Sequence, residues 1–369
     1  MRKIQLLSAA SALSLALVAG SALADSNQAY ISQYGSNNNA SVNQSFGSGN
    51  YFSAYQSGDT NFAGTQNSYY DYDYGYGYNY NSALNQNGNG NSASLTQEGN
   101  SNSIITTGSS YYYGGNNYTS GGNFQTGNSN SASLTQVGDN NTLTFSELGN
   151  SNSASVYTVG TVNNAYVGQT GDSNIANITQ YGDYNGYYYG YGAVTNQYGS
   201  GNYATIDQEG YANYWAYISQ YGNNNVAYQA QYGDYNYLTV GQVGDNDYAY
   251  AYQNGSNNIA SFTQYNYGYD AVNGNGLSVV QSGYNNYFSG YSYGDANYVS
   301  SYQIGNYNGL YAYQEGIGNQ INVFEYGEGN QSGVIQTGSY NNTGINQTGN
   351  YNYASINQSG NGNLAYVAQ

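Results

Sequence analysis

The sequence predicts an all-β protein, a parallel β-solenoid of stacked strand–turn–strand rungs. A phrase of eleven residues recurs along the chain, as in YATIDQEGYAN, YLTVGQVGDND and YASINQSGNGN. In each phrase Gly follows Gln by two residues, and Asn or Asp follows that Gly by three. Small and aliphatic residues alternate in the first half of the phrase, which is typical of a strand with one buried face.

We number each repeat from 1 to 11, with Gln at position 6, Gly at position 8 and Asn at position 11. Side chains at positions 2, 4 and 6 are expected on one face of the strand, and those at 1, 3 and 5 on the other. Gly supplies a positive φ and Asn tolerates one, so Gln-x-Gly-x-x-Asn predicts the turn. A right-handed helical coiled coil also has an eleven-residue period, but Gly and Asn in every repeat disfavour a helix.

Two repeats make one rung of 22 residues, and about 14 such rungs are expected to stack in parallel. Stacking places Gln on Gln and Asn on Asn, whose side-chain amides can then form hydrogen-bonded ladders. The expected ladder residues are Gln33, Gln97, Gln136, Gln180, Gln208, Gln231, Gln242, Gln253, Gln303, Gln314, Gln336, Gln347, Gln358, Asn102, Asn141, Asn213, Asn236, Asn308 and Asn363. Glu147 and Glu325 interrupt the Gln column and are candidate gatekeepers, because burial disfavours an ionised carboxylate.

The chain is expected to have three parts. Residues 1–24 have a basic start, an apolar run and a small-residue end, which predicts a secretory signal peptide. Residues 25–27 then form a short mature N-terminus, and residues 28–369 form the solenoid. Enlarged Tyr-rich turns are expected near 68–80, 109–119, 186–191 and 271–275.

Composition excludes several functions. Both cationic residues, Arg2 and Lys3, lie in the predicted signal peptide, whereas all 19 Asp and Glu lie in the mature chain. Without a basic patch, nucleic-acid binding is not expected. The chain has no Cys and no His, and we expect no cofactor, no metal centre and no enzyme activity. A disordered Asn/Gln/Tyr-rich tract is the main structural alternative, and the strict register of the repeats opposes it.

Two kinds of surface residue leave alternatives open. Asp residues that follow the turn Gly either bind calcium or are solvated turn formers that oppose unwanted edge pairing. Outward tyrosines, such as Tyr228 and Tyr250 on adjacent rungs of one sheet, either stack along the sheet or form an adhesive aromatic surface. The turn acids are Asp139, Asp172, Asp183, Asp234, Asp245 and Asp295.

The segments NSASLTQEGNSN (91–102) and NSASLTQVGDNN (130–141) resemble the curlin repeat. Curlins are secreted subunits of curli, the functional amyloid fibres of bacterial biofilms. The resemblance extends over residues 28–369 and implies an extracellular fibre subunit that is exported through the periplasm and functions in adhesion and the biofilm matrix. It also implies that the Gln and Asn ladder residues named above drive polymerisation. The implied partners are further copies of the chain, a curli-type nucleator and an outer-membrane secretion pore. No membrane span is expected in the mature chain.

The sequence departs from the curlin pattern in having more repeats, abundant Tyr, and no pore-targeting segment before the first repeat. Two alternative functions remain open at this point. One is a minor or nucleating subunit, and the other is a monomeric solenoid adhesin that binds carbohydrate or ice. For the fibre subunit, the terminal strand LAYVAQ is expected to be an uncapped edge on which the next copy stacks.

Overall fold

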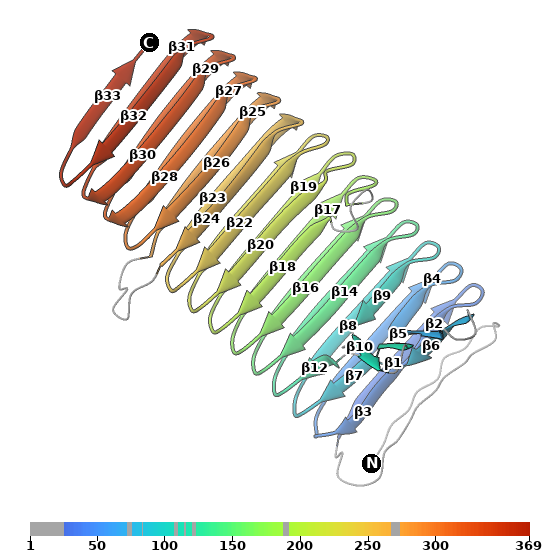
Figure 1. Cartoon of the computed structure of the whole chain (residues 1–369). Helices are drawn as coiled ribbons and strands as arrows, with labels where there is room; N and C mark the ends of the chain where they lie inside the picture. Colours follow the sequence, from blue (N-terminus) through green and yellow to red (C-terminus); the bar gives the residue numbers. More distant parts are fainter. Residues whose placement is uncertain are drawn as a thin grey trace. The chain divides into compact units, whose positions relative to one another are not determined.

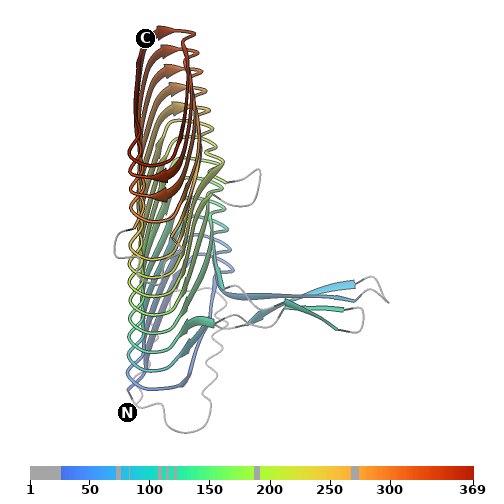
Figure 2. The same cartoon turned by 60° about the vertical axis from the view of Figure 1, so that its left-hand side comes forward.

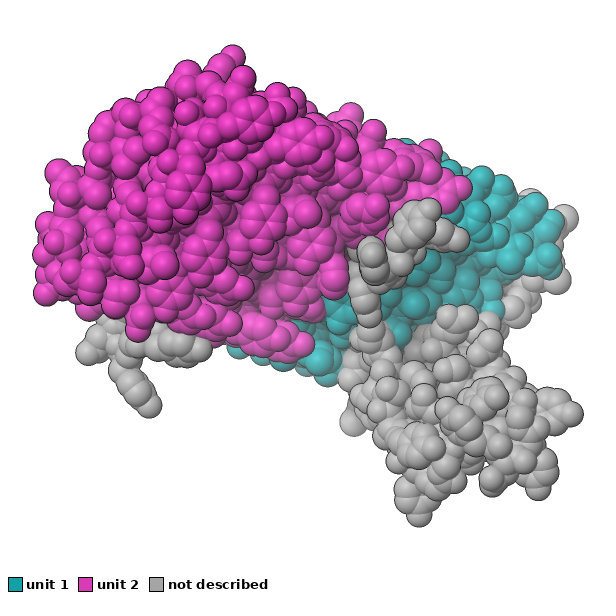
Figure 3. All heavy atoms as spheres, turned by 45° about the horizontal axis from the view of Figure 1, so that its top comes forward, with its two compact units in different colours: residues 1–179 teal, residues 180–369 magenta. Residues whose placement is uncertain are grey.

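The computed structural model describes residues 26–71, 76–82, 84–106, 110–113, 116–119, 123–186, 192–266 and 274–369. The predicted signal peptide lies outside these residues, as do most of the expected turns near 186–191 and 271–275. The chain divides into two compact units, Met1–Thr179 and Gln180–Gln369, which Figure 3 colours teal and magenta. Each unit is described by itself.

All regular elements of the described residues are strands, which confirms the all-β prediction. Strand β17 (Ile175–Tyr181) spans the boundary between the units. Unit 1 contains β1 (Gln28–Tyr34), β2 (Asn39–Ala40), β3 (Val42–Phe46), β4 (Tyr51–Ser57), β5 (Phe62–Asp71), β6 (Tyr76–Ser82), β7 (Leu84–Asn87), β8 (Ser92–Glu98), β9 (Ser103–Thr106), β10 (Ser110–Tyr113), β11 (Asn116–Thr119), β12 (Asn123–Thr126), β13 (Ser131–Val137), β14 (Thr142–Leu148), β15 (Ser153–Val159) and β16 (Asn164–Thr170).

The strands of unit 2 lie side by side in Figure 1. They are β18 (Ala193–Tyr198), β19 (Tyr203–Glu209), β20 (Trp215–Tyr221), β21 (Val226–Tyr232), β22 (Tyr237–Val243), β23 (Tyr248–Ser256), β24 (Ile259–Tyr265), β25 (Gly276–Tyr284), β26 (Tyr287–Tyr293), β27 (Tyr298–Asn306), β28 (Gly309–Ile317), β29 (Gln320–Glu328), β30 (Gln331–Ser339), β31 (Asn342–Asn350), β32 (Tyr353–Ser359) and β33 (Leu364–Ala368).

Unit 2 is built from two parallel sheets, one of odd-numbered strands from β19 to β33 and one of even-numbered strands from β18 to β32. Figure 2 shows these sheets as two facing layers. Pairing is in register, so that Gln208 lies opposite Gln231 and Gln231 opposite Gln253. Each strand therefore pairs with the strand two repeats later, as the 22-residue rung predicts, and the parallel β-solenoid is confirmed.

The core of each unit comes from the small and aliphatic residues at positions 2 and 4. Ala204 and Ile206 on β19 are buried, as are Leu238 and Val240 on β22. The residues between them are more accessible, so β19 has the strand alternation that the sequence predicts. Since each repeat has only one apolar face, two sheets must face one another to remove it from water.

Most turns in the described residues use two residues with positive φ, at positions 8 and 10. At position 8, Gly305 has φ +113°, and a Cβ there would overlap the carbonyl oxygen of Gly327 on the next rung. At position 10, Tyr307 has φ 57° and Val162 has φ 59°. Close stacking of neighbouring turns therefore makes Gly necessary at position 8 in this part of the fold, whereas position 10 tolerates larger residues at a cost in strain.

Unit 1 departs from the expected enlarged turns near 68–80 and 109–119. Strands β5 and β6 pair antiparallel as a hairpin, β10 and β11 form a second hairpin, and β11 also pairs with β5. The first hairpin interrupts a rung strand, because Phe62 pairs with Ser103 before the hairpin and the rung resumes at Leu84. Alternating Tyr has a high strand propensity, which accounts for strands where the sequence predicted turns.

Candidate functional site: the amide ladders

The Gln side chains at position 6 form hydrogen-bonded columns inside each unit. In unit 2, Nε2 of Gln208 donates to Oε1 of Gln231 at 2.7 Å, and Nε2 of Gln231 donates to Oε1 of Gln253 at 3.1 Å. All three are buried, where a hydrogen bond is electrostatically stronger than in water. The other predicted glutamines are arranged likewise: Gln33 donates to Gln56, Gln97 to Gln136, Gln180 to Gln208, Gln242 to Gln264, Gln253 to Gln281, Gln303 to Glu325, Gln314 to Gln336, Gln336 to Gln358 and Gln347 to Gln369.

The same amide groups also connect the two sheets of a unit. Nε2 of Gln231 on β21 lies 3.1 Å from the carbonyl oxygen of Trp215 on β20, and Nε2 of Gln253 on β23 lies 3.0 Å from that of Tyr237 on β22. A Gln amide has two N–H donors, and here one serves the next rung and the other serves the opposite sheet. This double use explains why Gln recurs at a position that faces the apolar core.

The Asn side chains at position 11 form a second set of columns with the opposite direction. The backbone N–H and Nδ2 of Asn308 both donate to Oδ1 of Asn286, on the preceding rung, at 3.1 Å. Nδ2 of Asn308 also lies 3.0 Å from the carbonyl oxygen of Gly327, on the following rung. Among the other predicted asparagines, Asn141 donates to Asn102, Asn236 to Asn213 and Asn363 to Asn341.

The Gln columns have one direction, and this gives their ends different chemistry. At the first rung of unit 1, Gln33 and Gln44 donate through Nε2 to the next rung, which leaves their Oε1 atoms as acceptors on the outer side. At the last rung of unit 2, Oε1 of Gln358 and Oε1 of Gln369 already accept from the preceding rung. Each Nε2 at that end donates once to a backbone carbonyl, so one N–H per amide remains available to a further rung.

The last rung of unit 2 also leaves part of its core face accessible. Val367 and Ala365 on β33 are half-buried, whereas Ile345 and Val323 at the matching position 4 of the preceding strands are buried. A further strand on β33 would therefore bury additional apolar surface. The exposed edge of the last rung thus has accessible core residues and amide donors. Inside the unit, the same two kinds of group face the next rung.

Two carboxylates are buried in the Gln columns. Oε2 of Glu147 accepts from Nε2 of Gln125 at 2.8 Å, and Oε2 of Glu325 accepts from Nε2 of Gln303 at 2.8 Å. Burial raises the pKa of Glu325 to about 7, and it raises the pKa of Glu147 well above its ordinary value. Oε1 of Glu147 is buried without a hydrogen-bond partner. Both sites therefore favour the neutral acid.

A third buried carboxylate, Asp247, lies outside the Gln columns and was not among the predicted site residues. Asp247 occupies position 11 of the repeat YLTVGQVGDND, where most repeats have Asn. The aligned repeats therefore show that an acid replaces an amide at this position. Oδ1 of Asp247 accepts from the backbone N–H of Asn275 at 2.7 Å, and Oδ2 is buried without a partner. Burial raises the pKa of Asp247 to about 7.

The turn acids at position 9 act as hydrogen-bond acceptors between rungs. Oδ1 of Asp245 accepts from the backbone N–H of Asn223 at 2.6 Å, and Oδ1 of Asp234 accepts from that of Tyr211 at 2.9 Å. Asn350 performs the same role for the N–H of Glu328. Among the residues that the structure describes, no three His, Cys, Asp or Glu side chains gather closely enough to hold a metal ion. The described chain also contains no helix long and apolar enough to cross a membrane.

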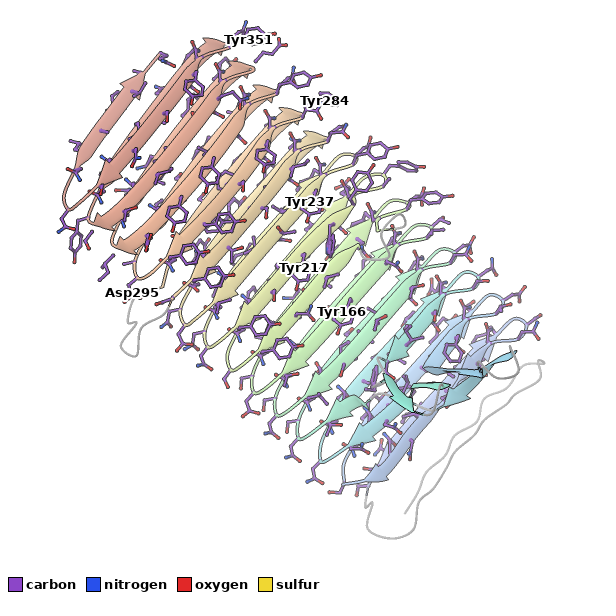
Figure 4. The ribbon with its side chains drawn as sticks, in the orientation of Figure 1. Tyr166, Tyr217, Tyr237, Tyr284, Asp295 and Tyr351 are labelled. Atoms are coloured by element: carbon purple, nitrogen blue, oxygen red, sulfur yellow. The ribbon has the colours of Figure 1, made fainter. Side chains whose placement is uncertain are left out.

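Many tyrosines of unit 2 are exposed, among them Tyr228, Tyr250 and Tyr291. Tyr228 pairs with Tyr250 on the next rung, as the repeat alignment predicts. Tyr217 and Tyr237, labelled in Figure 4, lie on the neighbouring strands β20 and β22. A groove of about 580 Å³ is open on the surface of unit 2. It is lined by Tyr214, Trp215, Tyr235, Tyr237, Asn257, Ile259 and Asn285.

Comparison with known proteins identifies the repeat. The family described as curlin associated repeat matches residues 24–45, 149–182, 199–233, 216–244 and 233–265. Comparison with curated proteins gives no match. Curlin proteins are structural rather than enzymatic, and they form extracellular surface fibres. Matches at five places confirm the predicted resemblance: the chain carries curlin-associated repeats.

Proposed function

We propose that the chain is a secreted subunit of extracellular amyloid fibres in a biofilm matrix, and that fibres grow when the last rung of one copy binds the first rung of the next. The observation that carries this proposal is the direction of the Gln columns. One end offers Nε2 donors at Gln358 and Gln369, and the other offers Oε1 acceptors at Gln33 and Gln44. Two copies joined head to tail would continue both columns without reversing an amide.

The contact between the last rung of one copy and the first rung of the next, which we call the joint, would also bury apolar surface. Ala365 and Val367 are partly accessible at the last rung, and docking of a second copy would cover them. The joint would also supply in-register backbone hydrogen bonds of the kind that join β31 to β33 inside the unit. Parallel stacking of identical columns is the arrangement that makes amyloid ladders stable.

The proposal includes export. Residues 1–24 have the composition of a signal peptide, and a curli-type nucleator and outer-membrane pore are the proposed partners during secretion and assembly. Mass spectrometry of the chain collected outside cells tests the export step. A mature N-terminus at Asp25 is expected, whereas an extracellular chain that retains Met1 would contradict cleavage at this site.

The joint is tested by placing charge at the ends of the columns. The variant with Gln358→Glu and Gln369→Glu replaces both outer donors by acceptors, which would face the acceptors of Gln33 and Gln44 in the next copy. We expect elongation of preformed seeds at pH 8 to fall by at least about tenfold, because unpaired acceptors and a buried charge oppose docking. Elongation is measured by amyloid-dye fluorescence, with fibres counted by electron microscopy.

A matched control adds the same charge to the same edge outside the columns. Asn357 and Asn361 are exposed, so the variant with Asn357→Asp and Asn361→Asp should elongate at close to the parent rate. Equal slowing of both variants would mean that charge alone opposes assembly. If purified parent protein remains monomeric and does not extend its own seeds, the fibre proposal is wrong.

A second candidate function, binding of neutral glycans, is favoured by the groove on unit 2. Its aromatic walls are suited to the apolar faces of sugar rings, and Asn257 and Asn285 add amide groups that can recognise hydroxyls. Trp215 packs edge-on against Tyr237, with ring centroids 6.0 Å apart. The mature chain has no cationic residue to attract an acidic polymer, so we expect the ligand to be uncharged.

Glycan binding has a direct optical test, because Trp215 is the single Trp of the chain and lies in the groove. Titration with neutral oligosaccharides should change Trp fluorescence in a saturable manner. Tyr235→Ala should weaken the response, whereas Tyr291→Ala, on an exposed position outside the groove, should leave it unchanged. No fluorescence change at millimolar glycan would exclude this function for the groove.

A further inference from the structure

Glu325 lies two rungs before the end of a Gln column. Oε2 of Glu325 accepts from Gln303, and Oε1 lies 3.3 Å from the side-chain oxygen of Gln347 on the next rung. In the orientation of the other glutamines, Nε2 of Gln347 donates to Oε1 of Gln369 at 3.0 Å, but it also lies 3.1 Å from the backbone nitrogen of Ala354, a second donor. Two acceptor oxygens that face each other at this distance need a proton between them.

The neutral acid supplies that proton. With a hydrogen on Oε1, Glu325 donates to the oxygen of Gln347, which also accepts from Oγ of Ser332 at 3.0 Å. Gln347 can then donate to Gln369, and Gln369 retains an outward N–H beside its bond to the carbonyl of Tyr353. In this state the end of the column matches the acceptor that Gln33 presents in a second copy.

The ionised acid requires the opposite arrangement. Oε1 of Glu325 then needs a donor, and rotation of the Gln347 amide by half a turn places its nitrogen 3.3 Å away. The Gln347 oxygen now faces Oε1 of Gln369 at 3.0 Å, so the Gln369 amide must also rotate in order to donate. That rotation breaks the bond from Gln369 to Tyr353 and turns an oxygen toward the next copy.

We propose that the proton on Glu325 sets the direction of the amides of Gln347 and Gln369, and thereby controls whether this sheet edge accepts a second copy of the chain. This inference rests on the proposed function and concerns its regulation. The side chains that face Glu325 are Gln303 on β27, Ser332 on β30 and Gln347 on β31, none of which titrates in this range. The other column ends through Gln336 and Gln358, both amides, and stays a donor at every pH.

Burial raises the pKa of Glu325 to about 7, so the proton is lost in the neutral range. The protonated fraction of such a group falls about tenfold for each pH unit above its pKa. Elongation at the last rung is therefore expected to decrease by about tenfold between pH 6 and pH 8. The edge would grow in mild acid and slow down as pH rises through the folded-state pKa.

The test uses the full mature chain, seeds of parent fibres, and elongation rates from pH 5.5 to 8.5. Glu325→Gln should elongate rapidly with little pH dependence. With Gln at this position, Gln347 and Gln369 keep the orientation in which each amide donates toward the next rung. Glu147→Gln is the matched control: it removes a buried acid from a Gln column of unit 1, but leaves Gln347 and Gln369 unchanged. It should keep the parent's decrease between pH 6 and pH 8.

A third variant separates the amide relay from a general effect of charge. Gln369→Leu removes the last amide, so its elongation should be slow in acid as well as at neutral pH, with a flat profile. The inference is overturned if Glu325→Gln keeps the parent's pH profile, or if Glu147→Gln flattens it equally. Failure of every variant to elongate at any pH would instead overturn the fibre proposal, and the regulation with it.

Discussion

The interrupted rungs of unit 1 and the uninterrupted rungs of unit 2 keep the same ladder geometry at different sequence spacing. In unit 1, Gln56 donates to Gln97 across 41 residues at 2.7 Å. In unit 2, Gln281 donates to Gln303 across 22 residues at 2.8 Å. The hairpins leave a rung and the chain returns to the same column. The comparison teaches that the fold depends on Gln residues stacking in columns. A constant spacing of 22 residues is the commonest way for the sequence to place them there, but it is not required.

Deletions should give the largest effect. Removal of residues 65–83 joins Phe62-Ala63-Gly64 to Leu84 and restores an eleven-residue repeat, so we expect a folded protein with stability within about 1 kcal/mol of the parent, since loop length has only a weak effect. Removal of residues 300–303 shortens one repeat to seven residues, too few to span the rung, and takes Gln303 out of its column. That variant should lose cooperative unfolding in denaturant monitored by circular dichroism. Equal behaviour of the two deletions would contradict columns as the organising feature.

The rung could be predicted from the sequence because its signals are local: Gln, Gly and Asn recur at fixed offsets, and each has a distinct stereochemical role. The hairpins could not be predicted, because their pairing partner lies in another insertion rather than in a neighbouring repeat; β11 pairs with β5. The candidate site was likewise predictable in part. Glu147 and Glu325 stand out as exceptions in a column, whereas the contact of Glu325 with Gln347 depends on amide orientations that no residue pattern encodes.

The regular rungs of unit 2 should be most sensitive at the turn glycines. Gly305→Ala places a methyl group against the carbonyl of Gly327 at φ +113°, and we expect a loss of about 3 kcal/mol or more in the free energy of unfolding. Gly333 is the matched control, because a Cβ there meets only Oγ of Ser355 at 4.0 Å. Gly333→Ala should change stability by less than about 1 kcal/mol. Similar losses at both positions, measured by urea unfolding, would show that close turn stacking is not the cause.

One buried acid in each unit allows the columns of the two units to be compared by a single substitution. Glu147→Gln in unit 1 and Asp247→Asn in unit 2 each restore the amide of their column, and each should stabilise the protein at pH 8 by about 1–3 kcal/mol. Because the folded-state pKa of each acid is raised, the parent is most stable relative to the variant below the unfolded pKa. The advantage of Asp247→Asn should therefore grow as pH rises through about 7. Thermal melting at pH 4, 6 and 8 measures this trend, and an advantage independent of pH would show that ionisation is not involved.

The smallest effect is expected for the tyrosines on the outer surface. There, pairs of rings on neighbouring rungs differ in how the rings are stacked, and the buried amide columns are not involved. Tyr198 and Tyr221 stack with centroids 4.7 Å apart and planes at 6°, whereas Tyr203 and Tyr228 are tilted at 46° with centroids 5.3 Å apart. Both pairs are largely accessible, so we expect a coupling energy of about 0.5 kcal/mol for the stacked pair and less for the tilted pair. A double-mutant cycle with Tyr198→Ala and Tyr221→Ala measures the first, and the equivalent cycle on the tilted pair is its control. Coupling above about 1.5 kcal/mol in either cycle would mean that outer rings, as well as inner amides, hold the rungs together.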